Sequence, residues 1–390
     1  MRWTEQRVLG AVVLALGCGR SDVYRPCHPV SPSCPEAPSS SMLSQCPAPG
    51  AVHGRVCATD GVTWVNGASV SLSATDCNGA AVTRTVASGA DGSFTLDGVP
   101  PGSWTVSASV GSFTHQLPVK VESGKTAEVS DGELCVKQGE VRIAVVTGTG
   151  DRIENLLAQL QLQYTLIRGD GAYWAMTGAP FFEDLAQLQK FDLVFVDCAA
   201  GRSGPSSGID FGPKAQQIED NLRAYVLQGG SLYSSDWALL FAHYAAPDAV
   251  SWATRSGQPV ASPLDTSELL GFAPQTLEAQ VSDPGLAQFL GKSTLPVAFP
   301  NQPGAASKNW GLIDSLAQGQ VLVRADGVTS CADLNCTMTG ATRDQVPLAV
   351  WVKTRPPDAP GGNVVYTSFH NIAQSGGDVG QLLKYLVLHL

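Results

Sequence analysis

The hydrophobic pattern of the chain changes its period near residue 140, and this change constrains the fold more than any other feature. Before residue 136, apolar and polar residues alternate in short runs such as ASVSLSA and GSFTLDGV. After residue 140, apolar runs such as VRIAVVTG alternate with amphipathic stretches such as DRIENLLAQLQL. Short alternating runs predict half-buried strands, whereas apolar runs separated by helices predict a buried, mostly parallel sheet. The 390 residues are therefore expected to form a small all-β sandwich followed by an α/β domain.

The first 18 residues have the anatomy of an export signal. Arg2 and Arg7 precede the apolar run LGAVVLALG, which is too short to span a bilayer. The run ends at Cys18 in the sequence ALGC, which resembles a bacterial lipobox with Ala in place of the usual first Leu. The resemblance implies a signal peptide over residues 1–18, lipidation of Cys18 and a place in the bacterial cell envelope, facing the periplasm or the cell surface. An ordinary signal peptide cleaved nearby is the alternative.

Residues 19–50 are rich in Pro, Ser and Cys and are expected to act as a tether, because such a composition cannot bury a core. Nine cysteines follow Cys18, and in an exported chain they favour disulfides, with at least one thiol left over. Cys331 and Cys336 are expected to close a small loop. No metal site is expected, and a cluster that combines His28 with Cys27, Cys34 and Cys46 is the weaker reading.

Residues 51–136 carry turn residues every eight to twelve positions, as an all-β sandwich does. Seven strands are expected, with the sequences HGRVCA, ASVSLSA, AAVTRTVA, GSFTLDGV, GSWTVSASV, FTHQLPVKV and TAEVSD. Asp91 and Gly92 are expected to form a tight turn, and Phe94, Leu96 and Val99 to fill the core. The alternative to a role in this turn is that Asp91 binds calcium together with Asp97.

The stretch ASGADGSFTLDGVPPGSWTVSAS resembles the carboxypeptidase regulatory-like domain, a transthyretin-like sandwich. The resemblance rests on Asp-Gly-Ser-Phe at residues 91–94 and on Pro-Gly-Ser-Trp-Thr-Val at residues 101–106. GRVCATDGVTWVNGASVSL is similar to the opening strands of that family. The resemblance implies an accessory module without catalytic activity over residues 51–136.

Residues 140–390 are expected to form a flavodoxin-like α/β domain with a doubly wound sheet. Strands are expected at 141–148, 165–170, 191–199, 231–236, 320–325, 347–353 and 363–369, and helices at 151–162, 181–190, 218–228, 237–244 and 380–390. Residues 246–318 are rich in Pro and Ser and are expected to be largely irregular.

Ligands of open α/β sheets bind at the carboxyl ends of the strands. Those ends are expected at residues 148–152, 198–201, 234–237 and 370–371. Cys198 is expected to be a half-buried thiol or a disulfide partner. The following run, GRSGPSSG, lacks the lysine of a phosphate-binding loop and is expected to be a flexible lid.

The order of these segments resembles the class I glutamine amidotransferase-like superfamily, in particular its trehalose-utilisation-like branch. The resemblance rests on FDLVFVD, on SLYSS after Gly-Gly, and on PLAVWVK followed by GGNVVYTSFHN. It implies a nucleophilic cysteine at the position of Ser235 or Asp236, and a base at His370. Neither Ser235 nor Asp236 is a cysteine, and Asn-Ile follows His370 where the family has Pro-Glu.

Three side chains are therefore the catalytic candidates: His370, Asp236 and Ser235. In a catalytic triad of Ser235, His370 and Asp236, the acid would be the sequence neighbour of the nucleophile, which is unusual. In addition, no G-x-S-x-G turn surrounds Ser235. Both Asp236 and His370 also have a structural alternative to a catalytic role. Asp236 would cap the helix at 237–244, and His370 would be hydrogen-bonded to loop carbonyls. The expected ligand-binding set comprises Ser235, Asp236, Trp237, His370 and Asn371.

The charge balance bears on the partners. With 24 basic and 34 acidic residues, the net charge of −10 argues against nucleic acid. No cofactor is expected. The sequence thus predicts a non-catalytic, lipid-anchored envelope protein that contacts the membrane through its lipid and binds a ligand, a carbohydrate or a protein. A hydrolase acting on a sugar or amide is the alternative, and a structural surface protein without a pocket is a third, weaker reading.

Overall fold

The computed structural model describes residues 46–201, 211–258, 269–299, 311–333, 336–354, 362–369, 371–372 and 377–390. All described residues belong to one compact unit, residues 46–390. The expected signal peptide, Cys18, most of the tether and His370 lie outside the described residues, as does the run GRSGPSSG beyond its first residue, Gly201.

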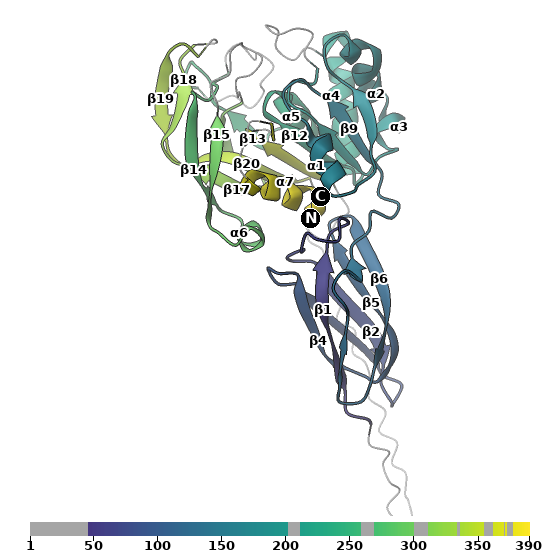
Figure 1. Ribbon diagram of the computed structural model, residues 1–390. Helices are drawn as coiled ribbons and strands as arrows, with labels where there is room; N and C mark the ends of the chain where they lie inside the picture. The colour runs from purple at the N-terminus through teal and green to yellow at the C-terminus, as the bar shows by residue number, and fades with distance from the viewer. Residues whose placement is uncertain are drawn as a thin grey trace, which may run out of the picture. The chain divides into compact units, whose positions relative to one another are not determined.

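The first part of the described chain is a β-rich domain with two four-stranded sheets (Figure 1). One sheet has the order β4-β1-β7, with β8 also paired to β1, and the other has the order β3-β2-β5-β6. All seven strands expected from the sequence are present, and the short β8 was not expected. Their bounds are β1 Gly50–Cys57, β2 Ser69–Thr75, β3 Ala81–Ala87, β4 Ser93–Val99, β5 Gly102–Val110, β6 Phe113–Val121, β7 Thr126–Glu128 and β8 Leu134–Cys135.

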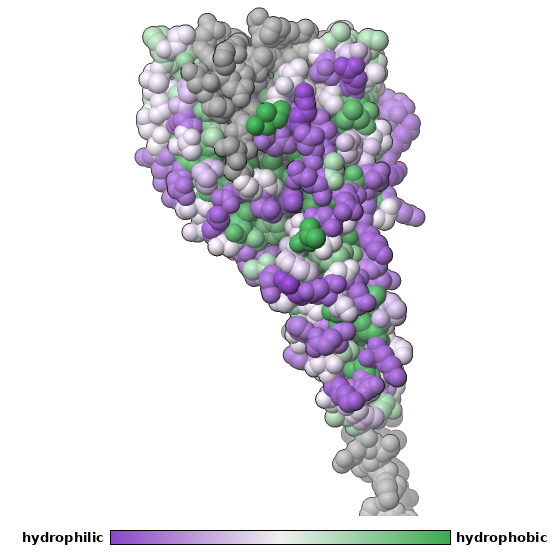
Figure 2. All heavy atoms as spheres, viewed as in Figure 1, coloured by the Kyte–Doolittle hydropathy of each residue, from purple (hydrophilic) through white to green (hydrophobic). Residues whose placement is uncertain are grey.

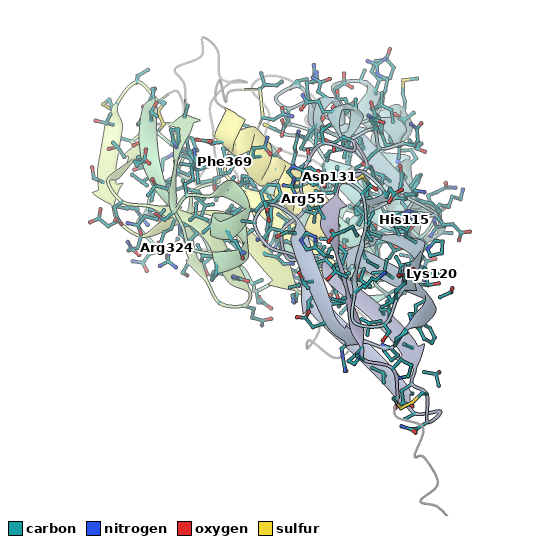
Figure 3. The ribbon with its side chains drawn as sticks, turned by 60° about the horizontal axis from the view of Figure 1, so that its bottom comes forward. Arg55, His115, Lys120, Asp131, Arg324 and Phe369 are labelled. Atoms are coloured by element: carbon teal, nitrogen blue, oxygen red, sulfur yellow. A yellow bond between two sulfur atoms is a disulfide. The ribbon has the colours of Figure 1, made fainter. Side chains whose placement is uncertain are left out.

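Alternate residues of these strands face a shared core. Val52 and Leu96 of one sheet and Leu72 of the other are fully buried members of the same cluster. The turn before β4 forms as expected, because Gly92 takes a φ of 76° and the Ser93 amide donates to the Asp91 carboxylate. Asp91 is therefore a turn residue. On the outer surface, Arg55 pairs with Asp131, both labelled in Figure 3.

Three disulfides join described cysteines: Cys46–Cys77, Cys57–Cys135 and Cys331–Cys336. The expected pair Cys331–Cys336 is confirmed. Because Cys46 is bonded to Cys77, it cannot serve the metal cluster that the sequence left as an alternative.

The second part of the described chain is built on a nine-stranded sheet with the order β10-β9-β11-β12-β21-β20-β17-β14-β15. The first four pairings are parallel and the last four are antiparallel, so the sheet is mixed rather than mostly parallel. Its strands are β9 Ile143–Thr147, β10 Thr165–Arg168, β11 Leu193–Val196, β12 Ser231–Ser235, β14 Gln275–Val281, β15 Thr294–Phe299, β17 Gln320–Ala325, β20 Val346–Lys353 and β21 Asn363–Thr367. Two further pairs form small sheets: β13 Val250–Trp252 with β16 Ile313–Leu316, and β18 Val328–Cys331 with β19 Thr339–Arg343.

Helices cover both faces of this sheet (Figure 1). Neighbouring residues of β9 belong to different cores, since Val145 lies in one apolar cluster and Val146 in the other. The Val145 cluster includes residues of α1 and α7, whereas the Val146 cluster includes residues of α2, α4 and α5. The helices are α1 Ile153–Gln159, α2 Ala179–Glu183, α3 Leu185–Leu188, α4 Ala215–Leu227, α5 Leu239–Ala245, α6 Pro284–Leu290 and α7 Gly377–His389.

The expectation of an irregular stretch at 246–318 is wrong for its described part. Strands β13 to β16 and helix α6 lie there, and β14 and β15 complete the large sheet. In β14 the buried Leu277 and Ala279 alternate with more exposed residues, which is the pattern of a strand with one buried face. Pro296 is tolerated because β15 is the edge strand.

The exposed surface is mainly polar in the face that Figure 2 shows. Large apolar side chains with substantial exposure are Val62, Leu166, Tyr173, Met176, Met338 and Ile372. Among the described residues, no helix combines the length and the apolar character needed to cross a membrane.

Candidate functional site

Four parallel strands, β9, β11, β12 and β21, end at the same edge of the sheet, and the predicted site residues that are described meet there. The Ser235 hydroxyl donates to Asp151 at 2.7 Å, and the Cys198 thiol donates to Asp236 at 3.2 Å. The Asn371 amide donates to the other oxygen of Asp151 at 3.0 Å. The strand ends named from the sequence thus form one connected network.

Asp151 is the centre of this network, although the sequence did not single it out. It lies between β9 and α1, is fully buried and also accepts from the Arg152 amide at 2.9 Å. The Asn371 side chain accepts from the Arg152 amide at 3.1 Å and donates to the Arg152 carbonyl at 2.7 Å. Asp151 therefore holds the ends of β9 and β12 and the segment after β21 together. An acidic residue between an apolar strand and a helix is the signal that points to it.

Asp236 occupies a sharp turn between β12 and α5. Its backbone φ is 45°, a left-handed conformation that is uncommon for a residue with a side chain. The residue is fully buried and starts the 3₁₀ turn η3 (Asp236–Ala238), whose N-cap is Ser235. The N-cap of α5 is Ala238, so the expected capping role of Asp236 is wrong. Its backbone carbonyl accepts from the Tyr366 hydroxyl at 3.1 Å, which fixes the turn.

Cys198 follows β11 and is a free thiol that is fully buried, not half-buried. Burial raises the pKa of this thiol well above its usual value, and the nearby Asp236 charge raises it further. The thiol therefore stays protonated near neutral pH and donates to Asp236. A protonated thiol is a weak nucleophile. Trp237 is also buried and packs with Cys198 and Ala199.

Asp197, at the end of β11, is a second buried acid. One of its oxygens accepts from the Ile153 amide at 3.3 Å, and the other has no partner within the ranges that the structure describes. Burial, followed by the charges of Asp151 and Glu154, raises the pKa of Asp197 well above its usual value. Because the folded state favours the protonated carboxyl, the contribution of Asp197 to stability falls as the pH rises above its unfolded pKa.

His370, the expected base, lies outside the described residues, so its predicted approach to Ser235 and Asp236 stays a prediction. Within the described ranges, no group of three or more His, Cys, Asp or Glu side chains is placed to hold a metal ion.

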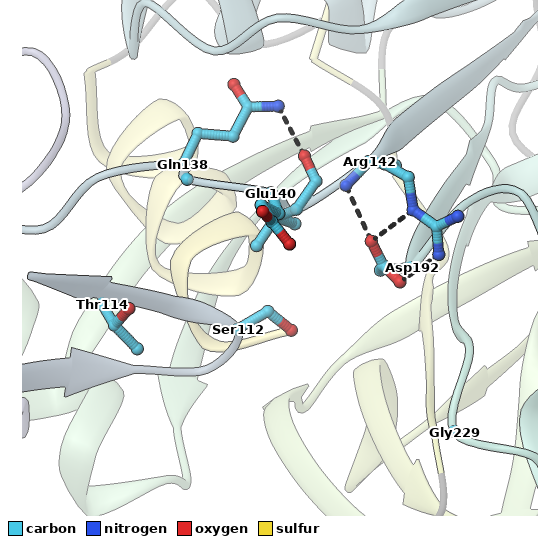
Figure 4. Close-up of a pocket in the computed structure, with 9 residues that line it drawn as sticks. Ser112, Thr114, Gln138, Glu140, Arg142, Asp192 and Gly229 are labelled. Carbon is cyan, nitrogen blue, oxygen red and sulfur yellow. Dashed lines mark hydrogen bonds and ion pairs between the residues drawn. The ribbon is translucent and has the colours of Figure 1, made fainter.

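A separate cavity of about 960 Å³ lies at the opposite, amino ends of the parallel strands (Figure 4). Arg142, Asp192 and Gly229, which line it, precede β9, β11 and β12, and Ser112 of the β5–β6 turn lines its other side. Within it, Arg142 binds Asp192 with Nε at 3.1 Å and Nη2 at 2.8 Å. This bidentate pair uses the side edge of the guanidinium. None of the predicted site residues lines this cavity.

Comparison with protein families identifies the first domain. Residues 51–132 match the family model of the carboxypeptidase regulatory-like domain. This match confirms the resemblance seen in the Asp-Gly-Ser-Phe and Pro-Gly-Ser-Trp motifs. No curated protein matches the chain.

Solved structures similar to the chain include glutamine amidotransferases, at low similarity. PurLQS from Thermotoga maritima is 10% identical with a TM-score of 0.35, and the match covers 64% of this chain and 98% of that one. A glutamine amidotransferase from Methylobacillus flagellatus is 11% identical with a TM-score of 0.35, covering 63% of this chain and 74% of that one. A second amidotransferase, from Thermotoga maritima, is 10% identical with a TM-score of 0.34, covering 63% and 81%. Similarity at this level carries no conclusion about activity.

Proposed function

We propose that this chain is a lipid-anchored protein of the bacterial cell envelope that binds a ligand, a glycan or a protein partner without catalysing a reaction. The regulatory-like sandwich, residues 51–136, is an accessory module between a tether and the binding domain, residues 140–390. We take the parallel half of the large sheet as flavodoxin-like, because its strands follow the order second, first, third, fourth, fifth.

The state of Cys198 and Ser235 carries the non-catalytic part of the proposal. Nucleophilic catalysis needs a thiolate, or a hydroxyl whose proton passes to a base. The Cys198 thiol is buried with a raised pKa, and the Ser235 hydroxyl donates to the Asp151 carboxylate, itself bonded to two backbone amides. Neither group is activated by a described imidazole.

The backbone of Asp236 favours the alternative, a hydrolase. A residue held at positive φ in a strand–turn–helix is the setting in which α/β-hydrolases present a nucleophile. In this alternative Asp236, Ser235 and His370 supply the chemistry. Conversion of a substrate would distinguish the hydrolase from the binding protein, because the binding protein converts none.

Binding and turnover are tested together on the purified full-length protein. A panel of sugars and amino acids, incubated overnight because Asp236 is buried, should contain a ligand that raises the unfolding midpoint saturably. Asp236→Asn should abolish that rise, and Asp220→Asn, at an exposed position of α4, should preserve it. Absence of any midpoint shift across the panel would count against a small-molecule ligand.

The same samples are assayed against chromogenic esters, amides and glycosides. We expect no turnover above buffer. Turnover that disappears in a folded His370→Ala variant would replace the binding proposal with the hydrolase.

Lipidation is tested by mass spectrometry of the native N-terminus. Because the apolar run ends at Cys18, the mature chain should begin with a diacylated cysteine at that position. An unmodified terminus beyond residue 18, with the protein in the soluble fraction, would refute the anchor and leave the binding proposal standing.

A further inference from the structure

Arg255 presents two buried nitrogen atoms without an acceptor. Its Nε and Nη2 are shielded from solvent, and in the described part of the chain they have no hydrogen-bond partner and Arg255 forms no ion pair. A guanidinium is charged at all physiological pH values, so it cannot shed its charge to avoid this cost. Buried donors of this kind are rare in folded proteins, and each calls for an acceptor.

The backbone around Arg255 fixes its position. Just before it, the Ala253 amide donates to Leu312 at 2.9 Å and the Ala253 carbonyl accepts from Leu270 at 2.9 Å. Just after it, the chain folds back, because the Thr254 hydroxyl donates to the Gln258 carbonyl at 2.6 Å. The guanidinium thus projects from a segment that is bonded on both sides.

The two nitrogens without an acceptor form the same edge that Arg142 uses elsewhere in this protein. Arg142 places its Nε and Nη2 against the two oxygens of Asp192, as the dashed lines of Figure 4 show. An acceptor with two oxygens in one plane matches this fork in both distance and direction. Such acceptors are carboxylates, phosphates and sulfates.

The segment that carries Arg255 holds another buried donor. Trp252, three residues earlier, is fully buried, and its indole nitrogen has no hydrogen-bond partner among the described residues. Its ring packs edge-on against Tyr366 with ring centroids 5.1 Å apart, and Tyr366 donates to the Asp236 carbonyl. The segment therefore adjoins the wall of the candidate site and is rich in donors without acceptors.

We propose that Arg255 is an oxyanion-binding residue, which takes a carboxylate, phosphate or sulfate group from a ligand through its Nε and Nη2. The net charge of −10 gives the chain no general attraction for anions, so anion binding requires a local donor group such as this one. The site is independent of the proposed function: it stands or falls on anion binding alone.

The experiment titrates the full-length protein with sodium acetate, sodium phosphate and sodium sulfate, against sodium chloride at equal ionic strength. At a tenfold excess over its dissociation constant, the preferred oxyanion should raise the unfolding midpoint by about 2 °C more than chloride does. Acetate against phosphate and sulfate distinguishes a carboxylate ligand from a tetrahedral anion.

Two arginine variants make the test specific. Arg255→Lys keeps the charge but loses the fork, so calorimetry should show an affinity at least about tenfold weaker. Arg223→Lys, at an exposed position of α4, should bind as the wild type does. An unchanged affinity in Arg255→Lys would overturn the proposal.

If the variant fails to fold, the wild-type protein still decides the question. With 15N-labelled arginine, one Nε–Hε resonance should shift saturably with the preferred anion. If none of the three oxyanions changes the unfolding midpoint or the arginine resonances of the wild-type protein, the proposal is overturned.

Discussion

Removing the Cys57–Cys135 disulfide, by changing both residues to serine, is expected to lower the free energy of unfolding of the sandwich by about 4 kcal/mol. The bond joins β1 to β8 across 78 residues of sequence, so its loss releases a large loop in the unfolded chain. Both cysteines also pair their backbones in parallel strands, and the serine pair leaves that pairing intact. Urea unfolding followed by circular dichroism measures the difference.

The Cys331–Cys336 disulfide is the matched control. It spans only 5 residues, so the same double change to serine should cost about 2 kcal/mol, roughly half as much. Equal losses for the two bonds would show that loop length does not govern their contributions.

Gly148→Ala is expected to destabilise the α/β domain by about 3 kcal/mol or more. A Cβ at Gly148 would lie 1.9 Å from the Cys198 carbonyl oxygen and 2.8 Å from that of Asp197. These are backbone atoms of the neighbouring strand end, so no side-chain rotation relieves the overlap. To make room, the ends of β9 and β11 must move apart. This movement also displaces the groups that are hydrogen-bonded to Asp151 and Asp236.

Gly380→Ala is the control for the same chemical change. Gly380 lies within α7, and nothing approaches its Cβ position within 4 Å. Alanine should therefore raise the free energy of unfolding by about 0.5–1 kcal/mol, because it favours the helix. Thermal unfolding of both variants measures the two changes in stability. A Gly148→Ala variant as stable as the wild type would contradict the tight approach of the two strand ends.

The elements that the sequence predicted share a strong local signal. Strands β9 and β11 are continuous apolar runs that bury both faces, and the sandwich strands alternate with clear turn residues. Strand β14 was missed because its alternation lies within a stretch dominated by Pro and Ser, where Leu277 and Ala279 form only a short pattern. The antiparallel edge of the sheet that β14 and β15 form therefore went unrecognised.

The site was predictable as a place but not as a network. Strand ends named from the sequence do meet, because parallel strands end at one edge. The role of Asp151 depends on Ser235 and Asn371, which are 84 and 220 residues away in the chain. No local pattern reports such contacts. The wrong prediction that Asp236 caps a helix has the same origin, because Cys198, its hydrogen-bond donor, lies 38 residues away in the chain.

The Cys57–Cys135 bond also governs how the protein responds to tension. A pull that arrives at Cys46 reaches Cys135 through the 11 residues to Cys57 and the disulfide, rather than through the Cys46–Cys77 disulfide and the 58 residues that follow Cys77. The longest extension between Cys46 and Cys135 is therefore about 40 Å, against about 200 Å if only the Cys46–Cys77 disulfide remained. A stretched chain would thus gain almost no length from the sandwich. In the lipid-anchored protein that we propose, any added reach of residues 140–390 under tension therefore does not come from the sandwich.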